Sequence, residues 1–290
     1  MKYQCFHVSI KDHIALITLN RPEKRNSMIA EFWDELPTII QIIDAQAKAR
    51  VIVIASTGPH FSAGLDLGVF GTSAPPEGKN AQQTAFYQRQ KGARFYDSVR
   101  HMQKAFTSLE QCRIPVLAAI QGGAIGAGVD LITACDMRYM TEDAYLSIYE
   151  INIGMTADVG TFPRLVKLIP EGIVKELAYT GRNMNAQEAK AVGLVNAVFA
   201  DQDTMLAEVM KIAAQISTKA PLAIYGSKQI INYSRDHNTA DGLDYIRIWN
   251  ASMLQADEIQ EAFKAKAEQR TAEFVDLPPI RGRMTNEIVD

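Results

Sequence analysis

A glycine-rich segment, residues 122–128, places four glycines within seven residues in an otherwise apolar part of the chain. An apolar run typical of a strand, 115–120, precedes it, and a run typical of a helix, 129–134, follows it. Glycine adopts positive φ without strain and lets other backbone approach closely, so this segment can turn sharply and expose N–H groups. We therefore expect a tight strand-to-helix turn around which the rest of the chain is arranged.

The order of the apolar patterns indicates an α/β protein. Residues 6–10 and 13–20 predict a β-hairpin, and the continuous apolar run 51–55 predicts a strand covered on both faces. Helical spacing marks 81–111 and also 27–47, where Pro37 is expected to kink or divide the helix. Strands are further expected at 137–140 and 145–148, and helices at 162–169, 174–180, 186–192, 203–216, 219–233, 241–254 and 259–270. Because the last third is nearly all helical, the pattern favours an α/β core with a helical C-terminal portion.

The chain reads as one catalytic unit without an evident linker. We expect a core over residues 1–200, a helical region over 201–273 that belongs to the same unit, and a loose tail over 274–290. Residues 68–80 are rich in Gly, Pro and Ser, which predicts a mobile loop.

Charge and cysteine usage exclude several classes of function. The 290 residues carry a net charge of −3 and no block of like charges, so neither nucleic-acid nor membrane binding is expected. No apolar run reaches the roughly 18 residues that suggest a membrane span. The three cysteines lack metal-ligand spacing, and the N-terminus lacks the apolar stretch of a signal peptide. These observations predict a cytoplasmic protein without a metal site.

Two turns could present N–H groups to one ligand, at Gly64-Leu65 and at Ala127-Gly128, where a helix begins. Two convergent N–H donors near a helix start can stabilise a developing oxyanion, as an enolate of a thioester requires. The alternative is that both are simply tight strand-to-helix turns.

Three carboxylates, Asp130, Glu150 and Asp158, lie among largely uncharged residues. Two acids that hold and release protons at opposite ends of a substrate suit a reaction in which one carbon is deprotonated and another is protonated. The alternatives are that Asp130 is a helix-end charge and that the acids form salt bridges with Arg164 or Arg138.

At these residues the chain resembles the crotonase (enoyl-CoA hydratase/isomerase) superfamily, and within it the dienoyl-CoA isomerase branch. The likeness runs from about residue 6 to about residue 266. Segments 61–67 and 123–136 match the two oxyanion segments of the family, including Ala134-Cys135-Asp136 after the helix. The runs 157–161, 233–237 and 243–254 are characteristic of the branch.

The resemblance implies a site. Leu65 and Ala127 would supply the two oxyanion N–H groups, although the family often has glycine where this chain has Ala127. The thioester and pantetheine would contact the first turn and the helix start, and a polar turn would face the adenine end of CoA; these residues are Ala63, Gly64, Asp66, Leu67, Gly128 and Arg25. Asp130, Glu150 and Asp158 would be the three acids of the branch.

The resemblance also implies the chemistry. A hydratase of this superfamily has glutamates at positions 130 and 150 and usually glycine at 158, whereas this chain has an aspartate at 130 and a third acid at 158. The implied activity is the shift of a 3,5-dienoyl-CoA to the 2,4-dienoyl-CoA in fatty acid degradation, by deprotonation at C2 and reprotonation at C6. Asp158 is favoured as the base and Glu150 as the acid, but the reverse stays open, and Asp130 would polarise the pocket.

Other activities remain as alternatives: a 2-enoyl-CoA hydratase, another crotonase-type enzyme, or a non-catalytic scaffold or RNA-binding relative. For the enzyme, the resemblance implies no metal or redox cofactor, since coenzyme A arrives with the substrate. It further implies a spiral of ββα units and a homotrimer or homohexamer, with the helical C-terminal region in the subunit contacts.

Overall fold

The computed structural model describes residues 3–66, 68 and 80–280. The strands are β1 Phe6–Lys11, β2 Ile14–Leu19, β3 Val51–Ser56, β4 Val116–Ile120, β5 Gly123–Ile125, β6 Met137–Thr141, β7 Tyr145–Ser147, β8 Asn183–Asn185 and β9 Ala197–Phe199. The helices are α1 Ala30–Gln46, α2 Ala81–Gln111, α3 Ala127–Thr133, α4 Thr161–Leu165, α5 Glu171–Thr180, α6 Ala186–Ala191, α7 Gln202–Ser217, α8 Pro221–Asp236, α9 Thr239–Met253 and α10 Ala256–Ala267, with 3-10 turns η1 Pro22–Lys24 and η3 Tyr149–Ile153.

The strands form two sheets built from repeated units. The main sheet has the order β1-β2-β3-β4-β6-β9, in which only the predicted hairpin β1-β2 is antiparallel, and the small sheet has the order β5-β7-β8. The consecutive strands β4 and β5 divide between the two sheets and lead into α3, and β6 and β7 do the same before η3. The predicted α/β class and the ββα repeat are therefore confirmed.

Strand β3 is buried along its whole length, as its apolar sequence predicts. Val51 and Val53 face the cluster that includes Val209 of α7, whereas Ile52 and Ile54 face the larger core. Since side chains alternate between the faces of a strand, each face of the sheet needs its own cover. Helix α7 supplies the first cover, and helices α1, α2 and α3 supply the second.

Helix α1 continues through Pro37 and is not divided. Proline removes one intrahelical hydrogen bond, but Trp33 and Leu36 before it and Ile39 and Ile40 after it are all buried in one core. Packing on both sides therefore outweighs the local break.

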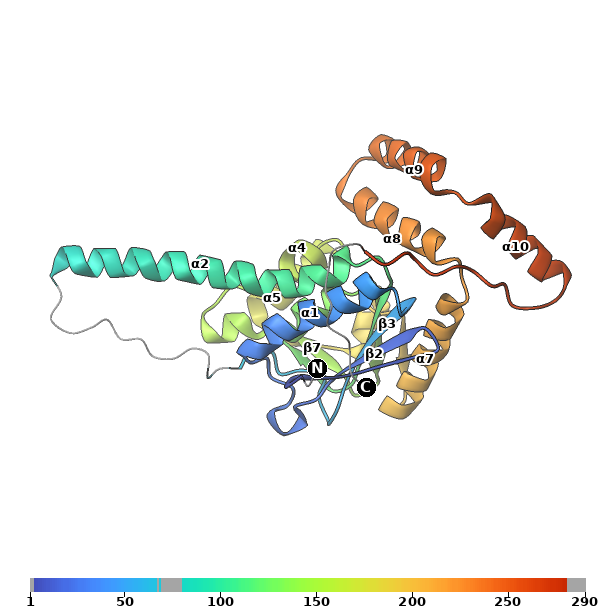
Figure 1. Cartoon of the computed structure of the whole chain (residues 1–290). Helices are drawn as coiled ribbons and strands as arrows, with labels where there is room; N and C mark the ends of the chain where they lie inside the picture. Colours follow the sequence, from blue (N-terminus) through green and yellow to red (C-terminus); the bar gives the residue numbers. More distant parts are fainter. Residues whose placement is uncertain (1–2, 67, 69–79, 281–290) are drawn as a thin grey trace.

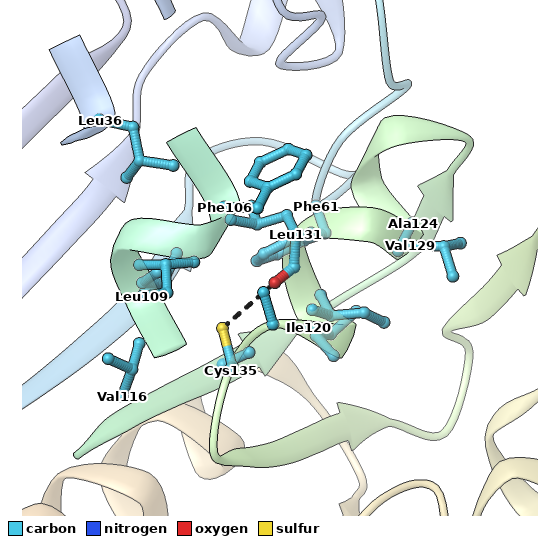
Figure 2. Packing of buried hydrophobic residues seen from close by; sticks show 14 of the residues in the cluster. Leu36, Phe61, Phe106, Leu109, Val116, Ile120, Ala124, Val129, Leu131 and Cys135 are labelled. Carbon is cyan, nitrogen blue, oxygen red and sulfur yellow. Dashed lines mark hydrogen bonds between the residues drawn. The ribbon is translucent and has the colours of Figure 1, made fainter. Parts of the chain in front are cut away.

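Helix α3 sits at the centre of the fold and all of its residues are buried. Figure 2 shows Leu131 of α3 among Phe106 and Leu109 of α2 and Phe61, and Cys135 donating to the Leu131 carbonyl at 3.4 Å. Asp130 of α3 is thus a carboxylate enclosed by an apolar core.

The first part of α2 extends away from the core, as Figure 1 shows. The buried residues of α2 all lie near its C-terminal end, at Ala105, Phe106 and Leu109.

The C-terminal helices α8, α9 and α10 lie to one side of the sheet-containing core (Figure 1). Among the helices of the described ranges, none has the length and apolarity that crossing a bilayer demands.

The described part of the tail is fastened to the core, so the prediction of a loose tail is wrong for residues 274–280. Arg50 donates to the Phe274 carbonyl at 2.7 Å and to Asp276 at 2.6 Å, and the Ile280 N–H donates to the Ala45 carbonyl at 3.0 Å. The tail therefore closes over the end of α1. Most of the predicted mobile loop 68–80, and residues 281–290, lie outside the described residues.

Candidate active site

A cavity of about 280 Å³ brings together the three predicted acids and both predicted oxyanion residues: Asp130 from α3, Glu150 from η3, Asp158 from the loop before α4, and Leu65 and Ala127 from the two turns. The remaining wall is largely apolar and consists of Trp33, Ala63, Phe95, Ser98, Met102, Ile125, Gly126, Tyr149, Ile153, Met155 and Val159. A largely apolar cavity with a few convergent polar groups is the usual form of a small-molecule site.

The two turns lie against each other because Gly64 has no side chain. Its φ is +80°, and a β-carbon there would lie 2.5 Å from the Ile125 carbonyl oxygen and 3.1 Å from the Ala127 nitrogen. The parallel bridge between Ser62 and Ala124 sets the alignment. Any other residue at 64 would therefore push the turns apart.

The N–H groups of Leu65 and Ala127 are available for a ligand. Their neighbours are used internally: Gly64 N–H donates to Ser62 Oγ at 3.1 Å, and Gly126 N–H donates to the Ser147 carbonyl at 2.9 Å. Within the described ranges, neither the Leu65 nor the Ala127 N–H donates to a protein acceptor. Ala127 also begins α3, where the helix dipole favours negative charge.

Asp130 is 1% exposed and uses its two carboxylate oxygens differently. Oδ1 accepts from the Thr161 N–H at 2.5 Å and from Thr161 Oγ1 at 2.8 Å. Oδ2 is buried and accepts no hydrogen bond from the described residues. Burial raises the pKa of Asp130 from 3.8 to about 7, the Thr161 hydrogen bonds oppose the rise, and nearby Glu150 adds to it.

Glu150 is aimed at the cavity by the 3-10 turn η3, which ends at Gly154 with φ 75°. A β-carbon on Gly126 would lie 3.2 Å from Glu150 Oε1, so the glycine leaves room for this carboxylate. Its Oε2 is buried and has no hydrogen-bond partner in the described part of the chain. Burial raises the pKa of Glu150, and the charge of Asp158 raises it further.

Asp158 is half-buried in the loop between η3 and α4. Its backbone carbonyl accepts from Gln103 Nε2 of α2 at 2.7 Å, which fixes the loop against that helix. Burial raises the pKa of its carboxyl group above the ordinary 3.8.

In the described part of the chain, Glu150 and Asp158 form no salt bridge with Arg164 or Arg138, which was the alternative for these two acids. Arg164 pairs with Glu110 at 2.8 Å, and Arg138 donates to backbone carbonyls, including that of Cys135 at 2.6 Å. Asp130 does lie in the first turn of α3, but its hydrogen bonds go to Thr161 at the start of α4. Its second oxygen accepts no hydrogen bond from the described residues.

The predicted binding residues divide between the cavity and its surroundings. Ala63 lines the cavity, and Gly128 packs closely, since a β-carbon there would lie 3.1 Å from the Ser62 carbonyl oxygen. Asp66 instead accepts from Ser27 Oγ at 2.8 Å. Arg25 is exposed, and its carbonyl accepts from the Ala63 N–H at 2.9 Å. Leu67 lies outside the described residues.

Sequence reasoning did not single out Thr161, Ser98 or Met102. Ser98 and Met102 follow Phe95 at spacings of three and seven on α2, so a helical-face pattern could have grouped them. Thr161 gives no such signal, because its contact with Asp130 joins residues 31 positions apart. Among the described residues, no group of three or more His, Cys, Asp or Glu side chains is placed to hold a metal ion.

A model of the enoyl-CoA hydratase/isomerase family matches residues 9–277. The chain is 43% identical to the mitochondrial Delta(3,5)-Delta(2,4)-dienoyl-CoA isomerase of Mus musculus over 92% of this chain and 80% of that protein. It is 38% identical to the peroxisomal protein of that name from Arabidopsis thaliana, over 90% of this chain and 92% of the relative. An enoyl-CoA hydratase structure from Bacillus anthracis aligns with a TM-score of 0.81 at 30% identity, covering 93% of this chain and 99% of that one. The crotonase-like fold implied by the sequence is confirmed.

These relatives overturn one prediction. The dienoyl-CoA isomerases that the chain resembles are named as mitochondrial or peroxisomal proteins, so the prediction of a cytoplasmic protein is wrong. Composition and the lack of an apolar N-terminal stretch carry no information on such compartments.

Proposed function

The chain belongs to the enoyl-CoA hydratase/isomerase family, and we propose that it is a dienoyl-CoA isomerase that converts a 3,5-dienoyl-CoA into the conjugated 2,4-dienoyl-CoA in fatty acid degradation. Relatives of that name support the reaction. The observation that carries the proposal is the pair of buried carboxylate oxygens, Asp130 Oδ2 and Glu150 Oε2, without hydrogen-bond partners in the described ranges. Both acids line one cavity with Asp158. A buried carboxylate oxygen that accepts no hydrogen bond is costly, so the presence of two such oxygens on acids of one cavity favours a chemical role.

The thioester carbonyl would accept from the N–H groups of Leu65 and Ala127. Removing a proton from C2 sends negative charge onto that oxygen as a dienolate, which the two donors and the start of α3 stabilise. A single donor of this kind is commonly worth about 10²–10³ in rate. The Ala127 methyl need not interfere, because the backbone makes the contact.

Glu150 and Asp158 would carry the two proton transfers. Asp158 takes the proton from C2 and Glu150 delivers one to C6, and the reverse assignment uses the same two side chains. Their raised pKa values favour both tasks, since an acid titrating closer to neutral pH can both release and accept a proton. Asp130, held by Thr161, would polarise the pocket between them.

These steps require carboxylates and N–H donors, so we propose that the enzyme uses no metal or redox cofactor and that coenzyme A enters as part of the substrate. Ala63, Gly64 and Gly128 would surround the thioester and pantetheine. Arg25, which is exposed beside the turn, would face the adenine end, and Asp66 would act by fixing that turn.

We also propose a homotrimer or a homohexamer. In α9, only Gly242 is buried, while Leu243 and Ile248 are 58% and 64% exposed. Phe263 of α10 is 71% exposed. Such apolar surface is typical of helices that are covered by another subunit.

The assay that tests the function follows ultraviolet absorbance. With a 3,5-dienoyl-CoA, the isomerase should generate the absorbance of a conjugated 2,4-dienoyl-CoA, over a panel of chain lengths. With a 2-enoyl-CoA, a hydratase would consume the enoyl absorbance. Loss of 2-enoyl absorbance without any diene formation would replace the proposal with a hydratase, and no turnover of either thioester would favour a non-catalytic relative.

A further inference from the structure

The run 233–237, at the end of α8, contains charged residues that reach the neighbourhood of the proposed active site. Arg235 Nη1 lies 3.3 Å from Glu110 Oε1 at the end of α2, and Asp236 pairs with Lys167, which follows α4. Glu110 therefore belongs to α2, which contacts the Asp158 loop through Gln103, and Lys167 follows α4, the helix that comes after this loop.

Glu110 joins two arginines. Its Oε2 accepts from Arg164 Nε at 2.9 Å and lies 2.8 Å from Arg164 Nη2, while Oε1 lies 3.3 Å from Arg235 Nη1 and accepts no hydrogen bond from the described residues. The side chains of Glu110 and Arg164 are only 17% and 12% exposed. Water screens such a pair less than an exposed one, so the carboxylate holds the Arg164 guanidinium firmly in place.

Arg164 lies across the backbone that carries Asp158. A β-carbon on Gly160, whose φ is +133°, would lie 1.8 Å from Arg164 Nη1, so the guanidinium rests directly on this glycine. Arg164 Nη1 also donates to the Val159 carbonyl at 3.5 Å, and Nη2 donates to Thr107 Oγ1 of α2 at 3.2 Å. The loop 158–160 is thus confined between α2 and Arg164.

We propose that Glu110 is a positioning residue for Asp158: it fixes Arg164 against residues 159–160, and the positive charge of Arg235 on α8 attracts Glu110. The inference rests on the proposed function, because it assigns Asp158 a part in proton transfer. It links the runs 157–161 and 233–237, which are more than 70 positions apart, through Glu110 and Arg164. A carboxylate displaced by about 1 Å can cost about 10²-fold in rate, so the network acts on turnover more than on substrate affinity.

The test compares Glu110→Gln with Glu188→Gln. Glu188 of α6 is a matched control, since it forms a bidentate ion pair with Arg182 at 2.6 and 2.8 Å but is not part of the Glu110–Arg164 contact with the Asp158 loop. In Glu110→Gln, kcat for the 3,5-dienoyl-CoA should fall about 10- to 100-fold with KM within about twofold, and Glu110→Asp should restore part of the loss. Glu188→Gln should keep the wild-type kcat. Arg235→Gln, at a more exposed site, should give a smaller fall in kcat. This variant replaces Glu110→Gln in the test if Glu110→Gln does not fold.

Hydrogen exchange separates the inference from the proposed function. Amide exchange over residues 157–161 should accelerate in Glu110→Gln and stay unchanged in Glu188→Gln. Wild-type kcat in Glu110→Gln, or an equal fall in Glu188→Gln, would overturn the positioning role. If the wild-type protein fails to isomerise any dienoyl-CoA, the proposed function is refuted. If amide exchange over residues 157–161 is the same in Glu110→Gln as in the wild type, the claim that Glu110 positions this loop is refuted as well.

Discussion

Replacing Asp130 with asparagine should stabilise the protein at alkaline pH. Asparagine keeps an oxygen that can accept from Thr161 and stays uncharged, whereas the native carboxylate must ionise inside an apolar core. Because burial raises the pKa of Asp130 from 3.8 to about 7, the folded state binds its proton more tightly than the unfolded chain does.

The sign and size follow from that difference. The stability linked to the Asp130 proton is fully present below about pH 4 and is lost as the pH rises through about 7. A gap of about 3 pH units, at about 1.4 kcal/mol each, corresponds to about 4 kcal/mol. Asparagine does not titrate, so Asp130→Asn should gain about 4 kcal/mol over the wild-type protein between pH 4 and pH 8.

Urea unfolding of both proteins at one fixed protein concentration, from pH 4 to pH 8, measures this difference. Asp66→Asn is a control without this pH dependence: hydrogen bonds from Ser27 and Gly68 lower the pKa of Asp66 below 3.8, so the linked wild-type advantage is already present at pH 4 and should stay nearly constant up to pH 8. If the stability difference between Asp130→Asn and the wild type does not vary with pH, the claim that burial raises the pKa of Asp130 is refuted.

Three further substitutions test the site. Gly64→Ala should cost about 1–3 kcal/mol in the free energy of unfolding and abolish turnover, because φ is +80° and the methyl would meet the Ile125 carbonyl oxygen; a stable, active variant would show that the turns can separate. Asp158→Asn should abolish the double-bond shift while calorimetry still detects binding of a saturated acyl-CoA, and wild-type-like turnover would contradict its role. Ala127→Gly should leave kcat within about threefold, since the N–H remains, whereas a larger fall would mean that the methyl itself positions the substrate.

Local patterns were sufficient where neighbouring residues decide the structure. The hairpin β1-β2, the buried strand β3 and the bounds of α2 all follow from short apolar patterns. The 3-10 turn η3, which carries Glu150, escaped prediction because it packs against α5, a helix further along the chain.

Long-range contacts explain what the sequence could not show. Arg50 binds tail residues more than 220 positions away, so a tail with polar, proline-containing sequence looked loose when read alone. Thr161 likewise meets Asp130 only in the folded chain. The three acids could be named from the sequence, but that two of them keep an unpaired oxygen depends on what surrounds them.

The proton route can be observed directly by running the isomerisation in D₂O and examining the 2,4-dienoyl product by NMR. Separate acids at the two ends of the pocket predict one solvent deuterium at C6, delivered by a carboxylic acid that has exchanged with solvent. A product without deuterium at C6, or a hydroxyacyl product, would contradict the central claim. That claim is that the acids of this cavity remove a proton at C2 and deliver one at C6, while Leu65 and Ala127 hold the thioester carbonyl.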